Sequence, residues 1–221
     1  MTPTNPNSIS PASALQTLQS GNRNFAMGFM RRSGTGPVSM AMNAGGQRPF
    51  VVVLTCSDSR MSPELLFDCG VGDIFVLRTG GNVVDALVVG SIEYAVSVLN
   101  SPLVVIMGHT RCGAVQAAIA GEDLGGSIGL VVGKVKRAVD TVRERLPNVG
   151  GEQLEYEVAS ENVRSGIGDL LADSRMLRDG VESGRLRIVG AMCDITNGAV
   201  RWLDAEEPAP AGLTDATDMC K

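Results

Sequence analysis

The stretch VVVLTCSDSR, Val51 to Arg60, joins an apolar run to a group of reactive side chains. The run is short and rich in β-branched valine, which is typical of a strand buried on both faces of a parallel sheet. It ends in Cys56, Asp58 and Arg60, which offer a thiol, a carboxylate and a guanidinium. Because sites in open α/β sheets lie beyond the carboxyl ends of the strands, we interpret this strand as the rigid support of a functional site.

Similar apolar runs alternate with helix-like segments along the rest of the chain. We expect strands at 50–55, 73–78, 102–108, 184–192 and 199–203, and helices from Ser10-Pro11 and at 61–69, 83–99, 112–121, 129–146 and 152–179. This alternation predicts an α/β fold with a mainly parallel central sheet, in which four parallel strands and a C-terminal edge strand are flanked by helices. We expect a single domain over residues 1–221, with flexible ends at 1–9 and 205–221.

Length and charge limit the class of protein. The 221 residues suffice for one compact domain with a sizeable core. The net charge is −5 and no dense Lys/Arg cluster is present, so we expect no nucleic-acid partner. The N-terminus lacks a basic and an apolar signal region, and no apolar run approaches the roughly 18 residues of a membrane span. We therefore expect a cytoplasmic protein with no membrane partner.

The cysteines also favour a reducing compartment. They are odd in number and widely scattered, at positions Cys56, Cys69, Cys112, Cys193 and Cys220. Such cysteines are more often buried, catalytic or metal-bound than paired in disulfides.

A second group of reactive residues follows the strand expected at 102–108. His109 is the only histidine in the chain, and Cys112 stands three residues later, where a helix begins. Either Cys56 or the His-x-x-Cys pair alone would more often be structural. Together, at corresponding ends of two parallel strands, the three side chains predict a zinc site whose fourth position stays open, as in catalytic sites. The helix N-terminus at Cys112 favours the thiolate that a metal requires.

Asp58 and Arg60 have roles that depend on this metal. The carboxylate could accept a hydrogen bond from a zinc-bound water and orient the resulting hydroxide, or it could bind the metal itself. Arg60 would hold Asp58 ionised through a two-pronged ion pair. Zinc lowers the pKa of its water from about 15.7 towards 7. A hydroxide in a small apolar pocket suits a small, linear, neutral electrophile.

With these residues identified, the chain resembles the β-class carbonic anhydrases over most of its length. The segments CSDSR (56–60) and GHTRCGAV (108–115) match the two zinc motifs of that family. Looser family blocks match at SGNRNF (20–25), GDIFVLRTGGNVVD (72–85), GSIEYAV (90–96) and ENVR (161–164). The resemblance implies reversible hydration of CO₂ to bicarbonate and a proton by a zinc-bound hydroxide. It also implies one Zn²⁺ per subunit held by Cys56, His109 and Cys112, and an orienting dyad of Asp58 and Arg60.

The same resemblance implies the substrate pocket and the assembly. The amide of Gln47 and the backbone N–H of Gly113 would donate to a substrate oxygen, while Phe75 and Tyr94 would line the pocket, Tyr94 usually from the neighbouring subunit. The family forms homodimers, often paired into homotetramers, with the site at the dimer interface. A strongly apolar helix at 83–99 fits such an interface.

Two other functions remain open at this point. Thr79-Gly80-Gly81 stands where the family often has Asn-Ala-Gly, so the pocket width is not determined and COS or CS₂ could replace CO₂ as the electrophile. A non-catalytic zinc-binding module is the other alternative, and the intact Asp58–Arg60 pair argues against it.

Overall fold

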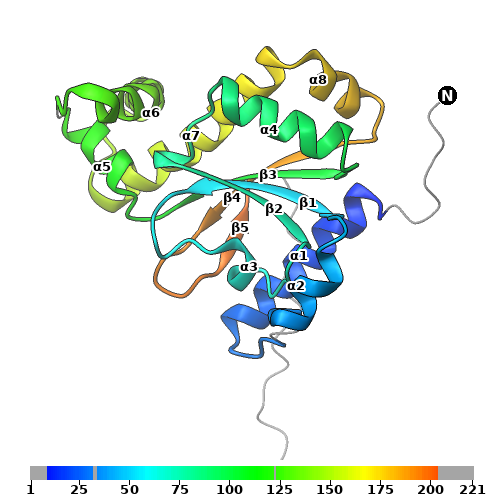
Figure 1. The fold of residues 1–221 in the computed structure, drawn as a ribbon. Helices are drawn as coiled ribbons and strands as arrows, with labels where there is room; N and C mark the ends of the chain where they lie inside the picture. Colours follow the sequence, from blue (N-terminus) through cyan, green and yellow to red (C-terminus); the bar gives the residue numbers. More distant parts are fainter. Residues whose placement is uncertain (1–8, 32–33, 122, 204–221) are drawn as a thin grey trace, which may run out of the picture.

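The computed structural model describes residues 9–31, 34–121 and 123–203, and these contain one five-stranded sheet (Figure 1). The strands are β1 (Val51–Cys56), β2 (Ile74–Thr79), β3 (Leu103–His109), β4 (Arg187–Cys193) and β5 (Val200–Trp202). Their order is β2-β1-β3-β4-β5. The first four pair in parallel, and β5 pairs antiparallel to β4 at the edge. The predicted sheet is therefore confirmed, including its edge strand.

Helices cover both faces of the sheet. They are α1 (Pro11–Ala26), α2 (Pro37–Asn43), α3 (Pro63–Leu66), α4 (Ala86–Ser97), α5 (Gly113–Ala120), α6 (Gly126–Arg145), α7 (Gly151–Asp173) and α8 (Arg175–Glu182), with a 3₁₀ turn η1 (Gly80–Asn82). Figure 1 shows α4, α7 and α8 on one face and α1, α2 and α3 on the other. Among the described residues, no helix is long and apolar enough to cross a bilayer.

Three helices differ from expectation. The helix predicted over 152–179 is two helices, because Ser174 has extended backbone and its hydroxyl accepts a hydrogen bond from the Leu177 N–H, which starts α8. The helix predicted over 61–69 shrinks to the single turn of α3. The helix α2 has no buried residue and so carried no amphipathic pattern to predict it. The predicted flexible ends, 1–9 and 205–221, lie outside the described residues except for Ile9.

The core has two parts, one on each face of the sheet. On β1, Val52, Leu54 and Cys56 pack into the cluster beneath α4 to α8, while Val51 and Val53 pack into the cluster beside α1 and α3. All six residues of β1 are buried, which explains why the strand has no polar alternation. This alternation of side chains aims Cys56 at the face covered by α4 to α8.

Candidate metal centre

The ligand atoms of Cys56, His109 and Cys112 converge at the carboxyl edge of the sheet. They all lie within 4.8 Å of one another, and the two sulfur atoms are 4.0 Å apart. Tetrahedral zinc with Zn–S bonds of about 2.3 Å would place two sulfurs about 3.8 Å apart. All three residues are buried. The spacing and the donor set therefore fit a zinc ion.

The turn after β3 brings two of these ligands together. His109 is the last residue of β3, Arg111 takes a left-handed conformation with φ of 55°, and Cys112 is the N-cap of α5. Thr110 ties the turn to the neighbouring strand, because its N–H donates to the Cys193 carbonyl oxygen at 3.0 Å. This turn thus brings the side chains of His109 and Cys112 together.

His109 presents one ring nitrogen to the cluster. Its Nδ1 lies 2.9 Å from the Thr110 carbonyl oxygen, which can only accept a hydrogen bond, so the proton sits on Nδ1. Its Nε2 is buried and has no hydrogen-bond partner among the described residues. A buried nitrogen lone pair without a partner is costly unless a cation takes it. This atom is an independent sign that the residues fit a metal.

The two thiols share a proton when no metal holds them. A hydrogen bond between the sulfurs lowers the pKa of Cys56, and the Asp58 N–H, whose nitrogen is 3.4 Å from Sγ, lowers it further against the effect of burial. The same bond raises the pKa of Cys112, against the N–H groups of Val115 and Ala114 in the first turn of α5. Because a metal binds thiolates, zinc would displace this remaining proton.

Asp58 and Arg60 form a closed pair beside the cluster. Arg60 Nε donates to Asp58 Oδ1 at 2.9 Å, and Nη2 donates to Oδ2 at 2.7 Å. These bonds are the main reason that the pKa of Asp58 lies well below its usual range. The three-residue group of potential ligands does not include Asp58, so in this conformation its carboxylate faces Arg60.

Arg78 holds the backbone between these residues. Its Nε donates to the Cys56 carbonyl oxygen at 3.2 Å, and its Nη2 donates to the Asp58 carbonyl oxygen at 2.6 Å. The sequence alone did not predict this role for Arg78. Its position could have been anticipated only from the pairing of β1 with β2, which places Arg78 opposite Thr55.

The predicted substrate residues are placed in different ways. Gly113 is the first residue of α5 and is exposed next to Cys112. The rings of Phe75 and Tyr94 are paired, with centroids 6.4 Å apart, and Tyr94 is 47% exposed on α4. Gln47 is exposed in the segment before β1, and no hydrogen bond joins its side chain to the cluster among the described residues.

Comparisons with known proteins agree on one family. The family model described as carbonic anhydrase matches residues 51–200. Carbonic anhydrase 2 of Mycobacterium tuberculosis is 38% identical over 192 residues, which are 85% of this chain and 90% of that protein. A carbonic anhydrase of Mycolicibacterium smegmatis is 38% identical over 196 residues, with 88% and 94% covered. A tetrameric beta-carbonic anhydrase of Sordaria macrospora superposes with a TM-score of 0.71 at 27% identity, covering 86% of this chain and 97% of that one.

Proposed function

This chain belongs to the β-carbonic anhydrase family and hydrates CO₂ with zinc, and from that premise we propose which of its residues carry the reaction. In this proposal Cys56, His109 and Cys112 hold the ion. The observation that carries the assignment is the buried convergence of two sulfurs with an Nε2 that has no other partner among the described residues. Zinc held at this point would supply a Lewis acid that lowers the pKa of water towards neutral pH.

The role proposed for Asp58 is to orient the nucleophile. An ionised carboxylate is only an acceptor of hydrogen bonds, so a hydroxyl group that donates to Asp58 must turn its lone pair elsewhere. Arg60 supports this role in two ways, because its paired bonds keep the carboxylate ionised and fix its plane. Asp58 would therefore fix the direction in which the attacking oxygen presents its lone pair to CO₂.

The remaining predicted residues are proposed to hold the substrate. Gly113 N–H belongs to the first turn of α5, where backbone N–H groups have no partner within the helix, so it can donate to an oxygen that gains negative charge. Gln47 would supply a second donor. Phe75 and Tyr94 would form an apolar wall that accepts linear CO₂ and keeps bulk water out.

We also propose that the chain acts as a homodimer or homotetramer of single-domain subunits. Large apolar side chains are exposed along α4 and at its C-cap, where Leu87 is 81%, Tyr94 47% and Val98 57% exposed, and such a patch supports an interface. Five strands in one sheet support a single domain. Cys56, Cys69, Cys112 and Cys193 carry no disulfide, which supports a cytoplasmic location.

Metal analysis combined with stopped-flow CO₂ hydration tests the proposal. We expect about one zinc per chain and a rate that rises with pH between about 6.5 and 9, as the nucleophile ionises. Cys112→Ser should lose both metal and activity. Full activity after exhaustive chelation would contradict the proposal. Sulfide release from COS in parallel assays distinguishes the alternative substrate, and it should be slower than CO₂ hydration.

A further inference from the structure

A single side chain of α7 holds the turn that lies beside the metal ligands. Asn162 Nδ2 donates to the Gly81 carbonyl oxygen at 2.8 Å, and both residues are buried. The two residues are 81 positions apart in the chain. Without this donor, the Gly81 carbonyl would be left buried and lose this hydrogen bond, which is a costly state.

Gly81 is wedged between the parts of the chain that carry Cys56 and Cys112. It has a left-handed φ of 59°, and a Cβ atom there would lie 3.1 Å from the Ala114 Cβ and 3.2 Å from Val135 Cγ2. Ala114 is in the first turn of α5, two residues after Cys112. The space around this peptide therefore allows very little movement, so a shift of Gly81 would displace the first turn of α5.

The turn also adjoins the strand end that carries Cys56. Gly81 lies two residues after Thr79, which pairs with Cys56 in the sheet. The Ser57 N–H donates to the Thr79 carbonyl oxygen at 2.9 Å, which ties the start of the turn to the residue after Cys56. Contacts thus run from Asn162 through the Gly81 turn to the residue after Cys56 and to the first turn of α5 after Cys112.

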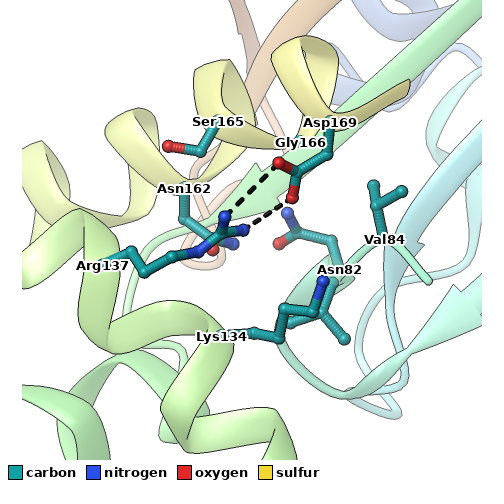
Figure 2. Close-up of a pocket in the computed structure, with 9 residues that line it drawn as sticks. Asn82, Val84, Lys134, Arg137, Asn162, Ser165, Gly166 and Asp169 are labelled. Carbon is teal, nitrogen blue, oxygen red and sulfur yellow. Dashed lines mark hydrogen bonds and ion pairs between the residues drawn. The ribbon is translucent and has the colours of Figure 1, made fainter. Parts of the chain in front are cut away.

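The helix α7 also lies against β3, the strand that ends in His109. Gly108 precedes His109, and a Cβ atom there would lie 3.0 Å from Val163 Cγ2 and 3.5 Å from the Ala159 carbonyl oxygen. Figure 2 shows Asn162 reaching from α7 into the small pocket that Asn82 of η1 also lines. The helix α7 therefore contacts both the turn beside Cys56 and Cys112 and the end of the strand that carries His109.

We propose that Asn162 is a positioning residue of the zinc centre, which acts by holding the Gly81 turn between the strand end that carries Cys56 and the first turn of α5 after Cys112. The inference rests on the proposed role of Cys56 and Cys112 as ligands. Contacts that surround the ligands orient them, and the loss of such a contact commonly weakens metal binding 10- to 100-fold. Because Asn162 acts through one peptide group, we expect a loss of about tenfold.

Cobalt-substituted protein tests this inference without relying on turnover. Asn162→Leu removes the donor while keeping a side chain of similar size, and Asn162→Ser shortens it. In both variants the thiolate-to-cobalt absorption band should shift, because the turn no longer fixes the positions of the two sulfurs. Zinc affinity, measured by competition with a chelator, should fall about tenfold. If the leucine variant does not fold, the serine variant decides the question on the same two readouts.

Asn22→Ala is the matched control. Asn22 is equally buried and donates to the Leu66 and Gly198 carbonyl oxygens at 3.0 and 2.8 Å, but it lies in the core on the opposite face of the sheet. Its loss should lower thermal stability and leave the cobalt band and zinc affinity unchanged. A wild-type cobalt protein without a thiolate band would overturn the assignment of Cys56 itself. A normal wild-type band that the Asn162 variants leave unmoved would overturn only the role of Asn162.

Discussion

Arg60 donates hydrogen bonds to the Asp58 carboxylate from two of its own groups. Its guanidinium donates to both carboxylate oxygens, and its backbone N–H donates to Oδ1 at 3.0 Å. Asp58 lies two residues after Cys56 of the proposed zinc site, and its side chain is only 18% exposed while that of Arg60 is 51% exposed. Arg60 thus covers the carboxylate from the solvent side without being buried itself. This arrangement gives Asp58 one orientation and one charge state at neutral pH.

Asp58→Asn should keep zinc and lose most of the turnover. The amide keeps the shape of the carboxylate, but its NH₂ group donates where an acceptor is needed, so the nucleophile is no longer oriented. We expect kcat to fall about 10- to 100-fold in stopped-flow assays, with unchanged metal content. Asp140→Asn breaks the exposed Lys136–Asp140 pair instead and should leave kcat unchanged. Near-normal kcat in a zinc-replete Asp58→Asn variant would refute the proposed role.

Turnover should depend on buffer. His109 is the only histidine of the chain, and as a metal ligand it cannot carry protons between the site and bulk water. Added imidazole should therefore raise kcat, on the order of tenfold, by taking over proton transfer. The measurement is kcat against imidazole concentration at constant pH and ionic strength. A fast turnover that does not respond to imidazole would contradict this prediction.

Removal of zinc should expose one reactive thiolate. In the metal-free cluster the pKa of Cys56 is lowered, chiefly by the hydrogen bond with Cys112, so Cys56 is ionised at neutral pH. Burial raises the pKa of Cys193 to about 12, so this thiol should stay protonated and unreactive. Alkylation followed by mass spectrometry should label Cys56 after chelation and spare it in the zinc-loaded protein. Equal labelling of Cys193 would show that the fold itself had opened. Cys220 lies outside the described residues and is not scored.

The protein should lose stability at alkaline pH partly through Cys69. Burial, with Asp73, Asp68 and Glu64 nearby, raises the pKa of Cys69 to about 12. Above about pH 8.5 the unfolded thiol releases its proton while the folded one keeps it, so the free energy of unfolding falls as pH rises. One thiol contributes a slope of up to about 1.4 kcal/mol per pH unit.

Cys69→Ala tests this slope. Urea unfolding at several values between about pH 9 and 11 should give a shallower decline for the variant, even if its stability at neutral pH is lower. Parallel declines for the two proteins would show that Cys69 contributes nothing to the pH dependence.

A charge on the exposed face of α4 should separate the subunits. Burying a leucine contributes about 1.5–3 kcal/mol, and in a two-fold interface each substitution counts twice. Leu87→Arg should therefore shift the protein towards monomers in sedimentation experiments and reduce kcat/KM, because Tyr94 lies on the same helix. Thr141→Arg adds the same charge at an exposed polar position of α6, so it is the control and should change neither. A monomeric wild-type protein would contradict the proposed assembly.

Local sequence determined the scaffold and the chemical identity of the site. Apolar runs such as Val51 to Leu54 are buried on both faces, and that requirement is visible in the residues themselves. The reactive residues directly after β1 and β3 could be assigned to one edge because parallel strands end together. For the same reason, the set of Cys56, His109 and Cys112 could be anticipated before their distances were known.

Only the tertiary structure decided how those ligands are held. The hydrogen bond from Arg78 to the Cys56 carbonyl oxygen depends on strand register. The hydrogen bond from Asn162 to the Gly81 carbonyl oxygen joins residues 81 positions apart in the chain. The exposed helix α2 and the break at Ser174 likewise depend on packing and on one capping hydroxyl. Periodicity and motifs report what a residue needs from its immediate neighbours. A hydrogen bond between distant segments exists only once the whole chain has folded, so no local pattern encodes it.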